Sequence, residues 1–178
     1  MEEEALYCLV YVAASQCSTK DGLNDTWACT ACPQAYALTE VTVVDESGHQ
    51  ALLGYDPARD RIVLALRGTL SFMDVIDDLE NAVAVKYGDC EGCKVGAGWL
   101  DATTKLMGSI TEALEGLVGK WGGAEIWITG HSLGAAMAPL VVRRLKVDEV
   151  DIYEKIRFPG EPVSIVTEYC TAAASFQP

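Results

Sequence analysis

The apolar positions of the chain recur at two spacings, and each spacing predicts a different kind of element. Apolar residues three and four positions apart predict helices over 5–17 and 99–118. Short runs with apolar residues predict strands at 40–45, which holds Val41, Val43 and Val44, and at 50–55, with a turn at 46–49 between them. The residues that carry the first helical pattern are Leu6, Leu9, Val10 and Ala13. The first part of the chain is therefore expected to hold a helix and, after a loop, a β-hairpin.

A second group of elements is predicted in the middle of the chain. The run at 61–66 is almost entirely apolar, which is typical of a strand buried on both faces. Another β-prone run leads into Ser132, and a helical pattern over 133–146 follows, with Pro139 as a point where the helix could bend. Strands that alternate with helices in this way predict an α/β layer fold with a partly parallel sheet.

The segment between that last strand and helix carries the clearest chemistry. It reads Gly130-His131-Ser132-Leu133-Gly134, and the order strand, Gly-x-Ser-x-Gly, helix is that of a nucleophile elbow. A serine hydroxyl is a poor nucleophile until it is raised clear of its neighbours and aimed at a base. The elbow does this by holding the serine backbone in a sparsely populated conformation. Gly130 and Gly134 are expected where a Cβ would clash between strand and helix, and Ser132 is the candidate nucleophile.

Length and charge narrow the class of protein. The 178 residues suffice for one domain with a real core, and half of them are apolar. A formal net charge of −13 disfavours nucleic acids and anionic membranes as partners. No apolar run reaches the length of a membrane span. The start Met1-Glu2-Glu3-Glu4 lacks the basic leader of a signal peptide, so the protein is expected either to stay inside the cell or to have its true start upstream.

Seven cysteines are many for a reduced cytosolic protein. They form two Cys-x-x-Cys pairs, Cys29 with Cys32 and Cys90 with Cys93, and three single residues, Cys8, Cys17 and Cys170. A zinc site is the weaker interpretation because the two pairs lie far apart in the chain, and a redox motif lacks a preceding strand. Disulfides are favoured instead, which indicates an oxidising, secreted or lumenal compartment. An odd count leaves at least one thiol over.

The chain resembles the class 3 (fungal-type) lipase family of the α/β-hydrolase fold. The resemblance covers about residues 13–145. Four segments carry it, in the family's order: Ala13 to Cys17 with Trp27-Ala28-Cys29-Thr30-Ala31-Cys32; Ile62 to Thr69, ending in Arg-Gly-Thr; Cys93 to Leu100, with Gly96 where the family often has His; and Gly130 to Ala135. The resemblance implies a three-layer α/β-hydrolase-like sandwich, incomplete at the C-terminal side of the sheet, with 1–178 as a single, partial domain.

The resemblance also implies the roles of particular residues. Ser132 would be the nucleophile of a serine ester hydrolase that acts on acyl lipids of the triacylglycerol type, with Thr69 and Leu133 forming the oxyanion hole. An amphipathic lid would follow, and its lipid-facing residues would be Phe72, Val75, Ile76 and Leu79. Protein groups supply nucleophile, proton transfer and oxyanion binding in such enzymes, so neither a metal nor an organic cofactor is expected. The implied partner is an acyl-lipid substrate at a lipid–water interface.

The histidines of the chain do not supply the base that such a serine hydrolase needs. The chain has two, His49 and His131, and the order in α/β-hydrolases is serine, acid, histidine. No histidine follows Ser132, which suggests a C-terminally truncated sequence and weak catalysis. Two alternatives stay open: an inactive protein that binds lipid or a partner, and a non-enzymatic disulfide or redox protein. Redox chemistry needs neither an elbow nor a lid, which argues against the second.

Overall fold

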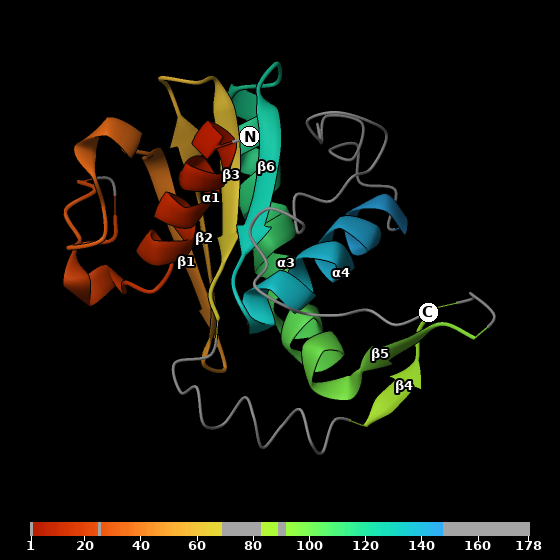
Figure 1. Ribbon diagram of the computed structural model, residues 1–178. Coiled ribbons are helices and arrows are strands. Elements are labelled where there is room, and N and C mark those ends of the chain that lie inside the picture. Colours follow the sequence, from red (N-terminus) through yellow and green to blue (C-terminus); the bar gives the residue numbers. More distant parts are fainter. Residues whose placement is uncertain (1, 25, 69–82, 89–91, 148–178) are drawn as a thin grey trace.

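A computed structural model describes residues 2–24, 26–68, 83–88 and 92–147 (Figure 1). Most of the predicted elements are present within a few residues of their expected bounds. The elements are the helices α1 (Glu2–Ala14), α3 (Ala97–Lys120) and α4 (Leu133–Val147), the short 3-10 helices η1 (Thr19–Asp21) and η2 (Gln34–Tyr36), and the strands β1 (Thr39–Glu46), β2 (His49–Asp56), β3 (Arg61–Leu66), β4 (Ala84–Lys86), β5 (Lys94–Gly96) and β6 (Glu125–Gly130).

The main sheet has the strand order β1-β2-β3-β6. β1, β2 and β3 pair antiparallel, whereas β3 and β6 pair parallel, with Arg61 opposite Glu125 and Leu66 opposite Gly130. The connection from β3 to β6 includes α3, as a parallel pair requires a crossover. The predicted partly parallel sheet is confirmed. Because β3 and β6 run side by side in register, both strands end at the same edge of the sheet.

Helices cover both faces of this sheet (Figure 1), which confirms the expected α/β layers. The side chains of β3 alternate between two cores: Ile62 and Leu64 pack with α3 and α4, and Val63 and Ala65 pack with α1. All four are buried. A strand buried on both faces reads as a continuous apolar run, so the sequence pattern of β3 follows from its central position.

The core between the sheet and α3 is aliphatic. Leu106, Ile110 and Leu114 of α3 are fully buried against the sheet, four residues apart on one face of the helix. Each such side chain contributes roughly 1.5–3 kcal/mol when it leaves water. The helix predicted over 99–118 is therefore present, and its apolar face packs on the sheet.

The face of α1 differs from the prediction. Leu6 and Leu9, on which the helical pattern was based, are 52% and 54% exposed, whereas Tyr7 and Tyr11 are buried. The two tyrosine rings contact each other with centroids 4.8 Å apart, and Tyr7 also meets the Trp127 ring of β6 at 5.3 Å. Aromatic rings bury more surface than leucine side chains, so their contacts across the sheet decide which side of the helix packs inward.

Two further features bear on the sequence predictions. The short hairpin of β4 and β5 was not predicted from the sequence.

Pro139 lies inside α4, which continues past it to Val147. Among the described helices, none combines the length and apolar character that a membrane crossing requires.

Candidate active site

The turn between β6 and α4 has the geometry of the predicted elbow. β6 ends at Gly130, α4 begins at Leu133, and Ser132 in between has φ of +54°. A positive φ is uncommon for a residue with a side chain and costs about 1–3 kcal/mol unless the surroundings enforce it. The turn is closed by hydrogen bonds from the Gly134 N–H to the His131 carbonyl (2.9 Å) and from the Ala135 N–H to the Ser132 carbonyl (3.0 Å).

The two glycines of the elbow are needed because backbones meet there. A Cβ placed on Gly134 would collide with the Leu66 carbonyl at the end of β3 and lie 3.0 Å from the Arg67 carbonyl oxygen. A Cβ on Gly130 would collide with the Gly134 carbonyl and lie 2.8 Å from the Ala135 nitrogen. Only glycine allows this approach without displacing backbone. The reason given for these glycines from the sequence is confirmed.

A third glycine brings the end of β3 against the elbow. A Cβ on Gly68 would lie 2.8 Å from the His131 carbonyl oxygen and 3.4 Å from the Ser132 Cβ. The Arg67-Gly68 segment thus contacts the elbow directly, and the chain continues from there to Thr69. Thr69 and the predicted lid residues Phe72, Val75, Ile76 and Leu79 lie outside the described residues.

Leu133 is the one predicted oxyanion residue that the structure describes. It is the first residue of α4, where backbone N–H groups lack helical partners and the helix dipole favours negative charge. Within the described ranges, no hydrogen bond of the Leu133 N–H is seen, whereas the next two amides close the turn. This arrangement suits an amide that binds an anionic oxygen beside Ser132.

The two histidines occupy different positions near this edge. His131 lies inside the elbow and its side chain is exposed. His49 begins β2 and is half-buried, and burial, followed by the charge of Lys105, lowers its pKa below the usual value of 6.5. No contact between His49 and Ser132 is seen in the described part of the chain. Neither histidine is assigned as a catalytic base.

A buried polar network supports the end of β3, and the sequence analysis did not find it. The Arg67 guanidinium donates to the Gln50 side-chain oxygen and to the Gly48 carbonyl, each at 2.8 Å. The Gln50 side-chain nitrogen in turn donates to the carbonyls of Ser15 (2.9 Å) and Cys17 (2.6 Å). Arg67 was noted only as part of Arg-Gly-Thr, and Gln50 carries no sequence signal because glutamine in a strand is unremarkable without its partners.

One buried hydroxyl stands next to the elbow. Thr129 Oγ1, on the residue before Gly130, has no hydrogen-bond partner among the described residues. Buried hydroxyls are normally paired, so this oxygen marks a polar point in the otherwise apolar packing of β6.

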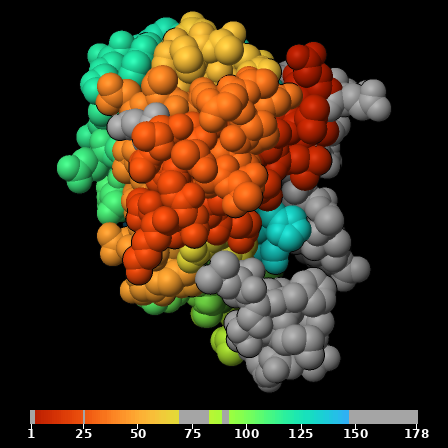
Figure 2. Space-filling view, turned by 90° about the vertical axis from the view of Figure 1, so that its left-hand side faces the viewer, coloured from red at the N-terminus to blue at the C-terminus, as the bar shows by residue number. Residues whose placement is uncertain are grey.

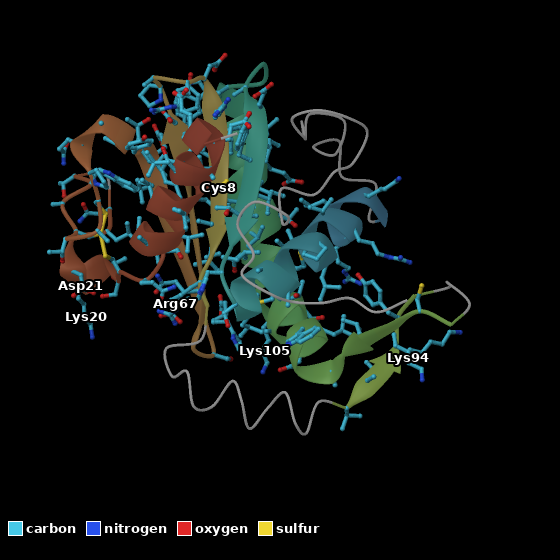
Figure 3. The ribbon with its side chains drawn as sticks, in the orientation of Figure 1. Cys8, Lys20, Asp21, Arg67, Lys94 and Lys105 are labelled. Atoms are coloured by element: carbon cyan, nitrogen blue, oxygen red, sulfur yellow. A yellow bond between two sulfur atoms is a disulfide. The ribbon has the colours of Figure 1, made fainter. Side chains whose placement is uncertain are left out.

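The cysteines support the prediction of disulfides. Cys29 is at bonding distance from both Cys17 and Cys32, and Cys93 is also disulfide-bonded. Cys90, the other member of the second Cys-x-x-Cys pair, lies outside the described residues. Figure 3 shows the sulfurs in the loop beside α1, far along the fold from the β4–β5 hairpin. A zinc site shared by the two Cys-x-x-Cys pairs is not formed by the cysteines that the structure describes.

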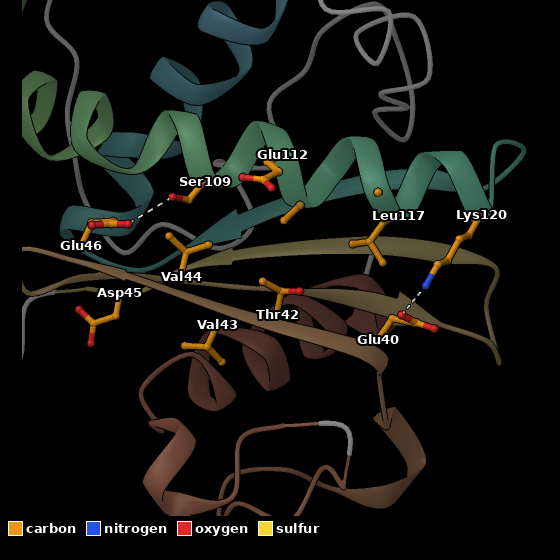
Figure 4. A pocket seen from close by; sticks show the side chains of 12 residues that line it. Glu40, Thr42, Val43, Val44, Asp45, Glu46, Ser109, Glu112, Leu117 and Lys120 are labelled. Atoms are coloured by element: carbon orange, nitrogen blue, oxygen red, sulfur yellow. Dashed lines mark hydrogen bonds and ion pairs between the residues drawn. The ribbon is translucent and has the colours of Figure 1, made fainter.

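A groove of about 580 Å³ lies elsewhere, between β1 and α3 (Figure 4). Four of its twelve lining residues are acidic, and two of these four are paired, Glu46 with Ser109 (3.2 Å) and Glu40 with Lys120 (2.6 Å). Ser132 and Leu133, the predicted site residues that the structure describes, do not line it. The groove is separate from the elbow and plays no part in the assignment of the site.

A strained serine between a parallel strand and a helix, on a sheet covered by helices on both faces, defines an α/β-hydrolase type of protein. The comparisons with known proteins agree. The family model of "Lipase (class 3)" matches residues 63–167, more than half of the chain. The chain belongs to the class 3 lipase family.

Individual relatives give the same result. The chain is 30% identical over 112 residues to the secreted mono- and diacylglycerol lipase A of Penicillium cyclopium, covering 63% of this chain and 35% of that protein. A solved triacylglycerol lipase, described as having a serine protease triad as its catalytic centre, superposes with a TM-score of 0.73 at 26% identity. That match covers 83% of this chain and 56% of the other.

A second solved structure is the Rhizomucor miehei lipase in complex with its propeptide. It superposes with a TM-score of 0.70 at 25% identity, covering 79% of this chain and 44% of that chain. The chain thus spans about a third of the length of the curated fungal lipase it matches and about half of the solved ones.

Proposed function

We propose that this protein hydrolyses carboxylic esters of acyl lipids, with Ser132 as the nucleophile. The observation that carries the proposal is the backbone of Ser132, at φ +54° in a turn where Gly68, Gly130 and Gly134 let neighbouring backbones approach closely. Such a conformation costs free energy, and it is explained if it serves to present the hydroxyl. The reaction forms an acyl-enzyme at Ser132 Oγ, releases the alcohol and then transfers the acyl group to water.

The oxyanion of the tetrahedral intermediate is assigned to two backbone amides. The Leu133 N–H at the start of α4 is one donor, and Thr69, which follows Gly68 at the elbow, supplies the other. Each such donor is worth roughly 3–4 kcal/mol of barrier. The reaction as proposed uses protein groups alone.

The substrate class is proposed from the family and from the expected lid. Relatives are named as lipases of mono- and diacylglycerol and of triacylglycerol, so acylglycerol esters are the first substrates to test. The segment 71–80 places Phe72, Val75, Ile76 and Leu79 at helical spacing, which suits a lid with an apolar face toward lipid. Secretion is proposed on two grounds: the cysteine usage and the secreted relatives.

A second candidate function concerns residues 1–178 by themselves, in which no histidine follows Ser132. A fold of this family that retains the elbow without a base would bind acyl lipid or a partner and leave the ester intact. Loss of the base of a serine triad costs on the order of 10⁶ in turnover.

Turnover measurements separate the two candidates. Purified 1–178 is assayed on emulsified triacylglycerol, diacylglycerol and monoacylglycerol, beside Ser132→Ala and the exposed control Ser47→Ala. Turnover that is abolished by Ser132→Ala and kept by Ser47→Ala supports the hydrolase. Absent turnover, together with sedimentation of the folded protein with lipid vesicles, supports the binding protein.

A further inference from the structure

The groove between β1 and α3 follows the outer strand of the sheet, and the proposed hydrolase site does not use it. Its volume is about 580 Å³. Contacts between the two elements lie toward its two ends, Glu46 with Ser109 at one end and Glu40 with Lys120 at the other (Figure 4). In Figure 2, the orange residues that include β1 lie at the surface, next to the green residues of α3. The groove therefore accompanies β1 over most of its length.

The hairpin geometry fixes which backbone groups of β1 bond to β2. Among the described strands, β1 pairs with β2 alone. The turn between them consists of Ser47 and Gly48, whose φ angles are +54° and +82°. Two successive positive φ angles are typical of a two-residue type I′ turn. The residues that flank such a turn, here Glu46 and His49, form a hydrogen-bonded pair.

The alternation along β1 then decides which backbone groups face outward. Thr42 and Val44 bond to β2 like Glu46, whereas Val43 and Asp45 turn their N–H and C=O groups away from β2. Figure 4 shows the side chains of Val43 and Asp45 pointing away from α3, yet both residues line the groove, so they line it with their backbone. Within the described ranges, no hydrogen bond from these backbone groups to a helix or loop is seen.

The charges around this open edge are mostly negative. Four acids and one lysine line the groove, and Lys120 is paired with Glu40 at 2.6 Å. The carboxylates of Asp45, Glu46 and Glu112 are exposed, and none of them forms an ion pair in the part of the chain that the structure describes. The open backbone groups of β1 are therefore surrounded by carboxylates without a cation.

We propose that the groove between β1 and α3 binds an extended, basic segment of a partner protein, which adds to β1 as a further strand. An added strand gains affinity from main-chain hydrogen bonds and specificity from its alternate side chains. Val43 and Asp45 supply two N–H donors and two carbonyl acceptors. Lysine or arginine side chains of the segment reach Glu46 and Glu112 on the α3 side and the Asp45 carboxylate on the other side. Their methylene stems cover the apolar part of the groove.

The charges favour this occupant over a second copy of the chain. Pairing of β1 with β1 of a second copy would bring the acids of both grooves together, and like charges on neighbouring strands are unfavourable. The net charge of −13 on each copy adds to this repulsion. A basic segment meets attraction at the same carboxylates.

The edge also limits the length of the segment. A β-bulge between Thr39 and Thr42 interrupts the regular strand on one side, and the turn at Ser47 ends it on the other. Bulges and short edge strands restrict pairing with other chains. The edge therefore accepts a short strand opposite residues 42–46.

Amide hydrogen exchange, followed by NMR, tests the proposal at single residues. The purified full chain is mixed with a short, end-blocked peptide of alternating lysine and valine. Saturating peptide is expected to slow the exchange of the Val43 and Asp45 N–H groups by at least about tenfold. The Val44 N–H, which bonds to β2, is the internal control and is expected to keep its rate. Absence of saturable binding, or protection elsewhere without Val43 and Asp45, would overturn the proposal.

Two further peptides separate strand addition from attraction by charge alone. The first carries N-methyl groups on the amides of alternate residues, in versions that block one edge or the other, and keeps every positive charge. The second has glutamate in place of lysine. The glutamate peptide and one of the N-methylated versions are expected to bind at least about tenfold more weakly in fluorescence anisotropy, because hydrogen bonds or charge pairs are lost. Undiminished affinity of both N-methylated versions would overturn the proposal.

Variants of the chain test the groove itself. Glu112→Gln is expected to weaken binding of the lysine peptide by about two- to fivefold. The matched control is Glu115→Gln, which makes the same change of charge on the same helix at an exposed residue outside the groove, and it is expected to keep the affinity. An equal loss in both variants would show binding to the overall charge and would overturn the proposal.

The edge of β1 is tested by Asp45→Pro beside Asp45→Ala. Both remove the carboxylate, and only proline removes the outward N–H, which an edge strand tolerates. Asp45→Pro is expected to bind the lysine peptide more weakly than Asp45→Ala, with folding checked by circular dichroism. Equal affinities of the two folded variants would overturn the proposal. A dimer of the chain that Asp45→Pro dissociates would assign the edge to a second copy and would also overturn it.

Discussion

The two ends of the β3–β6 strand pair are built in different ways. At the carboxyl end, Gly68, Gly130 and Gly134 let backbones meet, and Ser132 adopts a positive φ. At the amino end, the strands are joined by side-chain contacts. The Arg61 guanidinium lies 3.9 Å from the centre of the Trp127 ring and pairs with Glu125 at 3.6 Å. In open α/β sheets the carboxyl ends of the strands hold the ligand site. A positive φ occurs at both ends, at Ser132 and at Asp60, so strain alone does not distinguish them. The comparison suggests instead that close approach of backbones through glycine marks the end where chemistry is proposed, and that side-chain contacts stabilise the opposite end.

The largest effect is expected from a methyl group at the carboxyl end. Gly134→Ala places its Cβ against the Leu66 and Arg67 carbonyls, which belong to backbone and cannot rotate away. We expect a loss of more than about 3 kcal/mol in the free energy of unfolding, measured by urea denaturation. The matched control is Gly108→Ala in α3, where nothing lies within 4 Å of the new Cβ. That change is expected to stabilise by about 0.5–1 kcal/mol. Equal effects of the two variants would contradict the close approach of β3 and α4.

The amino end is tested by its buried carboxylate. Asp56 is fully buried and accepts hydrogen bonds from the Tyr11 hydroxyl (3.1 Å) and the Arg59 guanidinium (3.2 Å). Asp56→Ala leaves these donors without their acceptor and is expected to cost about 2–3 kcal/mol. The control is Asp101→Ala, whose exposed ion pair with Lys105 is worth about 0.3–0.5 kcal/mol.

The prediction for Asp56 includes a second readout. The variant is expected to keep the reactivity of Ser132 at temperatures where it is folded, because Asp56 lies at the opposite end of the strands from the elbow. A loss of Ser132 reactivity in folded Asp56→Ala would contradict the separation of the two ends.

A smaller effect concerns the strain at the elbow. Ser132→Gly removes the side chain from a residue with φ +54° and is expected to stabilise the protein by about 1 kcal/mol. Ser47→Gly, with the same φ in the β1–β2 turn, is the control and is expected to stabilise by a similar amount. Both are measured by thermal unfolding. A loss of stability in Ser132→Gly alone would show that the serine side chain supports the fold, and that the strain is not held for function.

The smallest effect concerns His49. Its pKa is lowered, chiefly by burial, so the unfolded chain binds a proton more readily than the folded protein. Neutral His49 therefore makes its whole contribution to the free energy of unfolding above pH 6.5. This contribution is lost as the pH falls from 6.5 toward the pKa of the folded state. His49→Gln is expected to flatten the fall in urea midpoint between pH 7 and pH 5. An unchanged pH profile would contradict the burial of this side chain.

Local patterns predicted most of the fold. The strand at 61–66 was found with its exact bounds because burial on both faces gives one continuous apolar run. The elbow was predicted because strand, glycines, serine and helix are adjacent in the sequence. The prediction of the inward face of α1 was wrong, because Tyr7 and Tyr11 contact rings from distant parts of the chain.

Of the candidate site, the sequence predicted the elbow, whose residues are adjacent in the chain, and missed the contacts between distant residues. The support of β3 by Gln50 and Arg67 joins residues 17 positions apart, and the groove between β1 and α3 joins elements that are distant in the sequence. Neither has a periodic signature. The family resemblance supplied Thr69 and Leu133 as oxyanion residues, and their roles stay predictions.

The central claim is that Ser132 is a nucleophile presented by the elbow, and covalent labelling tests it most directly. Purified 1–178 is incubated with a fluorophosphonate probe for hours, and the labelled residue is identified by mass spectrometry, with Ser132→Ala and Ser47→Ala beside it. The account predicts label on Ser132, its absence from Ser132→Ala and its retention in Ser47→Ala. No label on the folded protein, or the same label in Ser132→Ala, would contradict the claim.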